Sequence, residues 1–143
     1  MIRLEEVNEE NWRLPLKVAD AQKNYVPSPA MILARAYAYR KSRSVAYVIY
    51  SGETPVGMVM YHDCSSLNAY IFSELFIDER YQGRGYGRAA VESVLDRMRS
   101  DGRYRKVCLC YIEGNTAART LYQRFGFAET GRDGDEIIME LTL

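Results

Sequence analysis

The chain has few of the residues on which metal sites and disulfides depend. It carries three cysteines and one histidine among 143 residues. Cys64, Cys108 and Cys110 form no CxxC pair, and with His62 as the sole histidine no four-ligand zinc site is expected. We therefore predict three free thiols in a reducing compartment, with Cys108 and Cys110 on one face of a strand, and no metal.

Neither an excess of charge nor a long apolar run is present. Lysine plus arginine number 19 and aspartate plus glutamate also number 19, so the formal net charge is zero. Domains that bind nucleic acid usually carry a basic excess, and we expect no such partner. The first residues are acidic where a signal peptide would be apolar, and no apolar stretch approaches the roughly 20 residues that cross a bilayer. A cytoplasmic protein without a membrane segment is expected.

What is present is typical of one globular domain. Hydrophobic residues make up 48% of the chain and charged residues 27%. No linker, repeat or low-complexity tract interrupts the sequence, so residues 1–143 are predicted to form a single domain.

Apolar periodicity predicts the order of strands and helices. Strands are expected at 2–7, 44–50, 56–61, 70–77, 106–112 and 136–141. Helices are expected at 31–39, around 90–98 with Gly102 after its end, and between a cap at Asn115 and Gly126. Residues 8–24 are expected to be helical in part, although Pro15 interrupts them. This order predicts an α/β fold (an α+β mixed sheet) with helices packed on the sheet.

A glycine cluster stands between a predicted strand and a predicted helix. The segment Gln82-Gly83-Arg84-Gly85-Tyr86-Gly87 holds three of the ten glycines. Glycine lets the backbone approach a ligand closely, and a helix N-terminus presents N–H groups to an anion. The spacing is neither the GxGxxG of a Rossmann turn nor a Walker loop. The cluster by itself indicates either a tight turn or a phosphate cradle, with a pyrophosphate as the best-suited anion.

Three segments together resemble one family. Gln82–Gly87 is similar to the Q/R-x-x-G-x-G/A acyl-CoA loop of the GNAT N-acetyltransferases, Glu74–Asp78 to their central strand, and Asn115–Phe127 to their N-x-x-A-x-x-L-Y-x-x-x-G-F helix. With Val18–Gln22, these segments most resemble the bacterial spermine/spermidine (diamine) acetyltransferases of the BltD type. The resemblance implies the GNAT acyl-CoA N-acyltransferase fold, a central, mostly antiparallel sheet flanked by helices, and acetyl-CoA as donor.

One face of the last predicted helix carries Asn115, Ala118 and Tyr122. Asn115 and Tyr122 are seven residues apart, so at about 100° per residue they point within about 20° of each other. Ala118 between them leaves room for a narrow ligand. On position alone Tyr122 suits a core aromatic. The resemblance implies instead that Asn115 hydrogen bonds the pantetheine arm and that Tyr122 protonates the departing sulfur.

The remaining catalytic groups are expected on the central strand. Glu74 is the candidate base, taking the ammonium proton through a water, or else the partner of a basic neighbour. Related polyamine enzymes often have two adjacent acids here, whereas Ser73 precedes Glu74 in this chain. The resemblance also implies a backbone N–H near Ile77 as oxyanion donor. The predicted cofactor-binding set is Phe76, Ile77, Gln82, Gly83, Arg84, Gly85, Tyr86, Gly87, Arg88, Asn115, Ala118 and Tyr122.

A small cationic amine is the predicted acceptor. Carboxylates would attract the nitrogens of a polyamine and aromatic faces would line its methylenes. Glu74 and Tyr25 are the best candidates, and the weaker ones are Asp63, Glu9, Glu10, Trp12 and Tyr37. Two other functions stay open: a protein N-terminal or lysine acetyltransferase, and a non-catalytic acyl-CoA-binding module. A homodimer is an expectation from the family.

Overall fold

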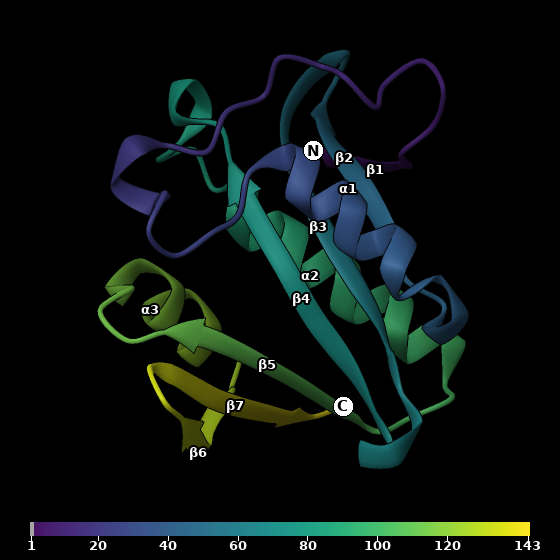
Figure 1. The fold of residues 1–143 in the computed structure, drawn as a ribbon, viewed down its shortest axis with the longest axis vertical. Coiled ribbons are helices and arrows are strands. Elements are labelled where there is room, and N and C mark those ends of the chain that lie inside the picture. Colours follow the sequence, from purple (N-terminus) through teal and green to yellow (C-terminus); the bar gives the residue numbers. More distant parts are fainter. Residues whose placement is uncertain (1) are drawn as a thin grey trace.

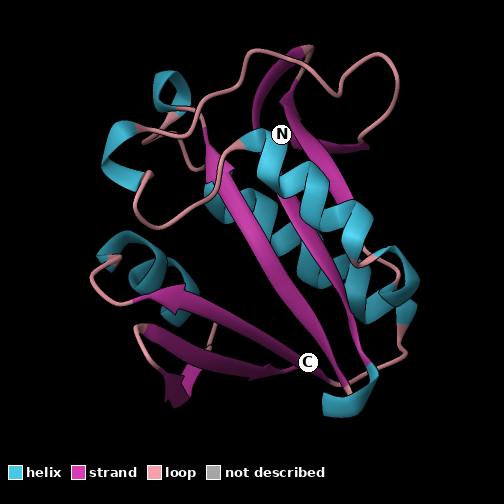
Figure 2. Ribbon diagram, viewed as in Figure 1, coloured by secondary structure: helices cyan, strands magenta, loops and turns pink. Residues whose placement is uncertain are grey.

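The computed structural model describes residues 2–143, which fold around one seven-stranded sheet (Figures 1 and 2). The strands are β1 (Ile2–Glu6), β2 (Val45–Ser51), β3 (Thr54–Cys64), β4 (Ala69–Ile77), β5 (Lys106–Ile112), β6 (Ala128–Asp133) and β7 (Glu136–Thr142). Their spatial order is β1-β2-β3-β4-β5-β7-β6. All neighbouring pairs are antiparallel except β4 with β5, which is parallel. The predicted mixed, mostly antiparallel sheet is confirmed.

Helices cover both faces of this sheet. The α-helices of the described residues are α1 (Pro29–Ala38), α2 (Tyr86–Asp101) and α3 (Thr116–Arg124), and the 3-10 turns are η1 (Asp20–Gln22), η2 (Arg40–Ser42), η3 (Ser65–Leu67) and η4 (Glu79–Tyr81). In Figure 1, α1 crosses the front of β2 and β3, and α2 lies behind the sheet. None of these helices is long and apolar enough to cross a membrane.

Local sequence signals mark the start of α1, the end of α2 and the start of α3. The Ser28 hydroxyl accepts a hydrogen bond from the N–H of Met31 at 3.3 Å and caps α1. Gly102, with φ of +68°, ends α2 in the left-handed region that glycine adopts at little cost. Asn115 caps α3, accepting from the N–H of Ala118 at 3.3 Å. These boundaries depend on neighbouring residues alone, and the three predicted helices are confirmed.

Two parts of the secondary structure differ from the prediction. Residues 8–24 hold only turns and the three residues of η1 instead of a helix. The Asn8 side chain accepts from the N–H groups of Glu10 at 2.8 Å and Asn11 at 3.0 Å, as a helix cap does, but a single turn follows and Pro15 has no N–H to continue it. The missed strand is β6, whose six residues are all exposed at the sheet edge. Its sequence therefore has no apolar alternation to reveal it.

Apolar side chains form a core on each side of the sheet. Under α2, residues such as Val59, Val91 and Leu95 pack together. Under α1, Ile32 packs with a second set that includes Met60. Because the two sets alternate along the central strands, both faces of these strands are buried and the sheet is held as a rigid support for the residues at its edges.

A β-bulge in β4 changes the face to which its side chains point. Tyr61 of β3 pairs with Phe72 and Met60 pairs with Glu74, so Ser73 is the extra residue. Phe72 lies in the core under α2, whereas Phe76, four residues on, lies in the core under α1. An extra residue in one strand re-aims the side chains that follow it. Glu74 is turned in this way toward α1.

The parallel strands β4 and β5 separate along their length. They pair only at Tyr70 with Val107 and at Ile71 with Cys108. Beyond these pairs they diverge toward α3, as Figure 1 shows. The later backbone groups of each strand are thus left without a partner in the other, and the sheet is open at its centre.

Gly57 in β3 holds the end of β4 close. A Cβ atom at this position would lie 2.2 Å from the backbone oxygen of Phe76. We expect Gly57→Ala to lower the free energy of unfolding by about 2 to 3 kcal/mol, because backbone on two paired strands must move. Gly131→Ala is the matched control, since its Cβ would meet Ile138 at an ordinary 3.7 Å. Equal denaturation midpoints for the two variants would contradict this expectation.

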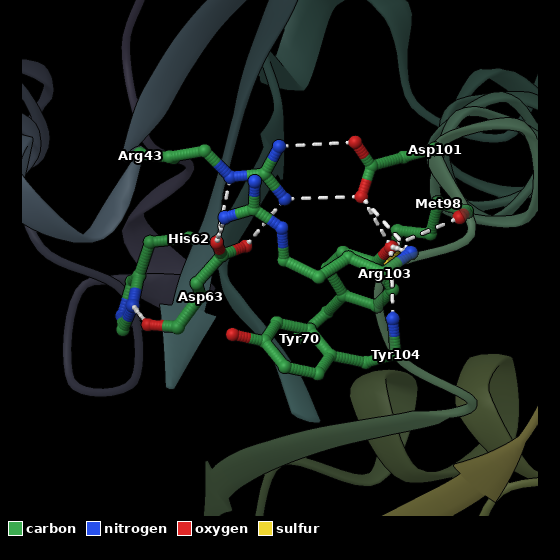
Figure 3. Close-up of polar contacts among 8 residues, drawn as sticks. All are labelled: Arg43, His62, Asp63, Tyr70, Met98, Asp101, Arg103 and Tyr104. Atoms are coloured by element: carbon green, nitrogen blue, oxygen red, sulfur yellow. Dashed lines mark hydrogen bonds and ion pairs between the residues drawn. The ribbon is translucent and has the colours of Figure 1, made fainter. Parts of the chain in front are cut away.

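A network of charges ties the start of β4 to the end of α2 (Figure 3). Arg43 donates to Asp63 at 2.6 and 3.1 Å and to Asp101 at 3.0 Å. The Tyr70 hydroxyl donates to Asp101 at 2.5 Å, and Arg103 also pairs with Asp63. Hydrogen bonds from Arg43 and then Tyr70 lower the pKa of Asp101. Asp63 is therefore held by Arg43 and Arg103 in this network and does not line the cavity described below.

Candidate functional site

A cavity of about 330 Å³ lies at the place where β4 and β5 diverge. The end of β4, the glycine cluster, α3 and the segment 19–26 all contribute to its wall. Most of the predicted site residues line it: Tyr25, Glu74, Phe76, Ile77, Gln82, Gly83, Gly85, Tyr86, Gly87, Asn115, Ala118 and Tyr122. Segments that are far apart in the sequence thus meet at one site.

The glycine cluster has the backbone geometry of an anion cradle. Gly83 and Gly85 have φ of +76° and +84°, a region that other residues rarely adopt. Gly85 is the cap of the 16-residue helix α2, and no side chain caps that helix. The first N–H groups of α2 therefore stay available at its positive end, which is where phosphates bind in many proteins.

Arg84 and Arg88 are the predicted cofactor residues that do not line the cavity. Both side chains are exposed. The guanidinium of Arg84 lies 5.9 Å from the ring centre of Tyr81. Their contact with a cofactor stays a prediction.

The end of β4 presents unpaired backbone groups to the same cavity. Asp78 donates its N–H to the oxygen of Val56 on β3 at 2.8 Å. Alternate residues of an antiparallel strand bond to the same neighbour, so the N–H groups of Leu75 and Ile77 point the other way, toward the diverging β5. The Ile77 oxygen accepts from the Gln82 side chain at 3.0 Å, which anchors the glycine cluster to this strand.

Asp78 holds in place the chain before η1, which leads into the cavity wall formed by residues 19–26. Its carboxylate accepts from Arg80 at 3.0 Å and from the N–H of Lys17 at 3.0 Å. These bonds, led by the one from the Arg80 side chain, lower the pKa of Asp78 to about 2. The segment before η1 is thereby attached to the end of β4.

Asn115 is oriented by two hydrogen bonds to its oxygen. Its Oδ1 accepts from the N–H of Ala118 at 3.3 Å and from Nε2 of Gln22 at 3.4 Å. The residue is 5% exposed and lines the cavity, and its Nδ2 makes no hydrogen bond within residues 2–143. An amide with its oxygen occupied offers two N–H donors, which suit a carbonyl oxygen of a ligand. Nothing in the sequence indicates that Gln22 contacts Asn115, because this contact to α3 is tertiary.

The ring of Tyr122 packs in the core, and the residue also lines the cavity. The ring packs edge-on between Phe72 and Phe127, with centroids 5.7 and 5.6 Å away. Its hydroxyl makes no hydrogen bond to any described residue. Burial, and then the negative charge of Glu74, raise the pKa of Tyr122. The hydroxyl therefore stays protonated near neutral pH and is suited to donate.

Glu74 is a nearly buried carboxylate in the same cavity. It is 9% exposed, and its Oε1 pairs with the Nη1 of Arg35 from α1. Burial raises the pKa of Glu74 to about 7, with Arg35 opposing the rise and Glu136 adding to it. A carboxyl that titrates near neutral pH can both take up and release a proton. Arg35 was not found from the sequence, since nothing local on α1 marks it.

The other acceptor-site candidates are distributed differently. Tyr25 lines the cavity, and its hydroxyl lies 3.1 Å from where a Cβ of Gly114 would stand. Cys110 and Ser73 also line the cavity, although the sequence did not indicate them. The structure places the remaining candidates, Glu9, Glu10, Trp12 and Tyr37, outside this lining, with their side chains exposed.

An open central sheet, an uncapped glycine loop and a buried Tyr–Glu pair beside them define an acyl-CoA-dependent transferase site. The chain belongs to the acetyltransferase (GNAT) family, whose model matches residues 4–127. The protein is thus a GNAT acetyltransferase. Among curated proteins it is similar to the spermine/spermidine N(1)-acetyltransferase of Bacillus subtilis (strain 168), with 29% identity over 136 residues that cover 89% of this chain and 88% of that protein.

Solved structures show the same fold. The spermidine N-acetyltransferase of Vibrio cholerae, in complex with CoA and spermine, superposes with a TM-score of 0.78 at 18% identity, over 99% of this chain and 95% of that one. The NatC complex bound to Gag peptide and CoA superposes with a TM-score of 0.74 at 20% identity, over 99% and 98%. Because both share the fold, the acceptor amine has to be inferred from the site.

Proposed function

We propose that this protein is an N-acetyltransferase that transfers the acetyl group of acetyl-CoA directly to a primary amine of a small polyamine or diamine, of the spermidine or spermine kind. The observation that carries the proposal is that two buried residues, the carboxylate Glu74 and the tyrosine Tyr122, line one cavity. The similarity to the Bacillus spermine/spermidine enzyme supports the substrate class.

The residues of the cavity fit acetyl-CoA. The N–H groups at the start of α2 would hold its pyrophosphate, since no side chain caps them. Gly83 and Gly85 have positive φ and no side chain, so the backbone of the loop can approach the phosphates closely. The N–H of Leu75 and the Nδ2 of Asn115 would donate to the amide oxygens of the pantetheine arm. When bound, acetyl-CoA supplies the thioester from which the acetyl group is transferred.

We assign one residue to each chemical step. Glu74 takes one proton from the ammonium through a water, which leaves a neutral amine to form the C–N bond. The N–H of Ile77 donates to the carbonyl oxygen as negative charge develops on it. Tyr122 gives its proton to the sulfur as the C–S bond breaks, and a second proton from the nitrogen restores the tyrosine through water. The overall products are an amide, a thiol and one released proton.

The charge of the site favours a cationic acceptor. Glu74 lies in the cavity, and Glu136 at the start of β7 adds negative charge to its surroundings. Tyr25 offers an aromatic face to a methylene chain. A peptide amine is the alternative acceptor. A non-catalytic acyl-CoA-binding module is disfavoured, because such a module needs neither a carboxylate titrating near neutral pH nor an unbonded tyrosine hydroxyl.

A substrate panel tests this function. Purified protein with acetyl-CoA should release free thiol in the presence of spermidine, spermine or a diamine, well above the rate without amine. Peptides with a free N-terminus or an internal lysine form the comparison set. Turnover with the peptides and none with any polyamine would overturn the proposed acceptor and favour the alternative. Release with neither set would favour the binding module.

Three further expectations rest on the same proposal and stay predictions. They are a homodimer, a cytoplasmic location and a single domain over residues 1–143. Sedimentation of the full chain at micromolar concentration would measure the first.

A further inference from the structure

The contact between Arg35 and Glu74 engages only one oxygen of the carboxylate. Arg35 stands in the last turn of α1, and its Nη1 pairs with Oε1 of Glu74 across 39 residues of sequence. The other oxygen, Oε2, makes no hydrogen bond to any part of the chain that the structure describes, and Glu74 lines the cavity. A two-pronged pairing would have occupied both oxygens. The one-sided pairing leaves Oε2 for a ligand or a water.

Two charged groups of opposite sign and two neutral titratable groups surround Glu74, and they come from four elements. Arg35 from α1 is the positive one, with its side chain nearly half exposed. Glu136 from β7 adds negative charge, and the neutral hydroxyl of Tyr122 from α3 and the thiol of Cys110 from β5 line the same cavity. Without a positive partner, a carboxylate this deeply buried is held in its protonated form, which cannot accept a proton. The state of Glu74 therefore depends on Arg35.

We propose that Arg35 is a positioning residue for the base: it holds Glu74 by Oε1 in the ionised form and leaves Oε2 facing the cavity, where it receives the proton of the acceptor ammonium. This rests on the proposed amine acetyltransfer, and it assigns to α1 a part in the chemistry without contact to the acceptor. The proposal also gives the bulge at Ser73 a purpose. The bulge turns Glu74 to the face of the sheet that α1 covers, and Arg35 can reach Glu74 only on that face.

The pH dependence of kcat/KM for the amine tests this role. In Arg35→Gln the acid limb should move to higher pH by about one unit or more, since the opposing positive charge is gone, so that the rate below the limb falls about tenfold. Arg35→Lys keeps the charge and should restore most of the limb. Arg40→Gln is the matched control, because Arg40 lies over the Tyr37 ring at 4.1 Å and does not contact Glu74. An unchanged limb in Arg35→Gln would overturn the proposal.

A direct titration separates this inference from the proposed function. With glutamate labelled at its side-chain carboxyl carbon, the signal of Glu74 is the one missing in Glu74→Gln. Its midpoint should be higher in Arg35→Gln than in the wild type, with no amine or acetyl-CoA present. If the midpoint is higher in Arg35→Gln but no amine is acetylated, the effect of Arg35 on Glu74 stands and the proposed function fails. If the midpoint is unchanged while polyamines are acetylated, the function stands and the role of Arg35 fails. A loss of activity equal at every pH, together with a lowered Tm, would show a merely structural contact and would also overturn it.

Discussion

Replacing Tyr122 by phenylalanine is expected to lower kcat about 100- to 1,000-fold, the usual contribution of a general acid. The affinity for acetyl-CoA should change by no more than about twofold, because the interaction is made in the transition state. The ring stays clamped between Phe72 and Phe127, so the substitution removes the hydroxyl and leaves the packing. The hydroxyl has no hydrogen-bond partner among residues 2–143, and no buried donor is left unpaired by its loss.

Steady-state kinetics and acetyl-CoA titration together measure this effect. Tyr104→Phe is the matched control, because Tyr104 packs edge-on against Tyr70 and lies outside the cavity lining. It removes the same atom without touching the site, so its kcat should equal that of the wild type. A Tyr122→Phe enzyme with unchanged kcat would remove Tyr122 from the mechanism. Full activity with a weakened acetyl-CoA affinity would make it a binding residue instead.

Replacing Glu74 by glutamine is expected to lower kcat/KM for the amine about 100-fold or more at neutral pH. Glutamine keeps the shape of the side chain but accepts no proton, so the acid limb of the pH profile should also disappear. The limb of the wild-type enzyme is expected near pH 7, since burial raises the pKa of Glu74 to about 7. Glu92→Gln, on the exposed side of α2, is a matched control that should keep the wild-type profile.

The same substitution should stabilise the protein at alkaline pH. The folded-state pKa of Glu74 is raised from 4.5 to about 7, so the native state binds the proton more tightly than the unfolded chain does. Its contribution is present at low pH and is lost as the pH rises from about 4.5 through about 7. At pH ~8 Glu74→Gln should therefore be more stable than the wild type by about 1 to 3 kcal/mol, with little difference at pH ~4. Denaturant unfolding at both pH values measures it, and a destabilised variant at pH ~8 would contradict a strained, buried base.

Local sequence alone determined the parts of the site that one element can build. The face of α3 with Asn115, Ala118 and Tyr122 follows from the helical repeat, and these residues do meet in the cavity. The cradle at Gly83 and Gly85 follows from glycine itself, which is the residue that adopts positive φ without strain. Short-range geometry of this kind does not depend on what packs around it.

Tertiary structure decided what these groups can do. The bulge at Ser73 and the divergence of β4 from β5 depend on pairing between strands, and no pattern within β4 reveals them. The burial of Glu74 and its contact with Arg35 join residues 39 positions apart, and those two facts set its proton affinity. Residues 8–24 follow the same rule, since their path is fixed by side chains such as Asp78, directly after β4, rather than by a helical repeat. Charge state and cavity shape are properties of the surroundings, and the surroundings exist only in the folded chain.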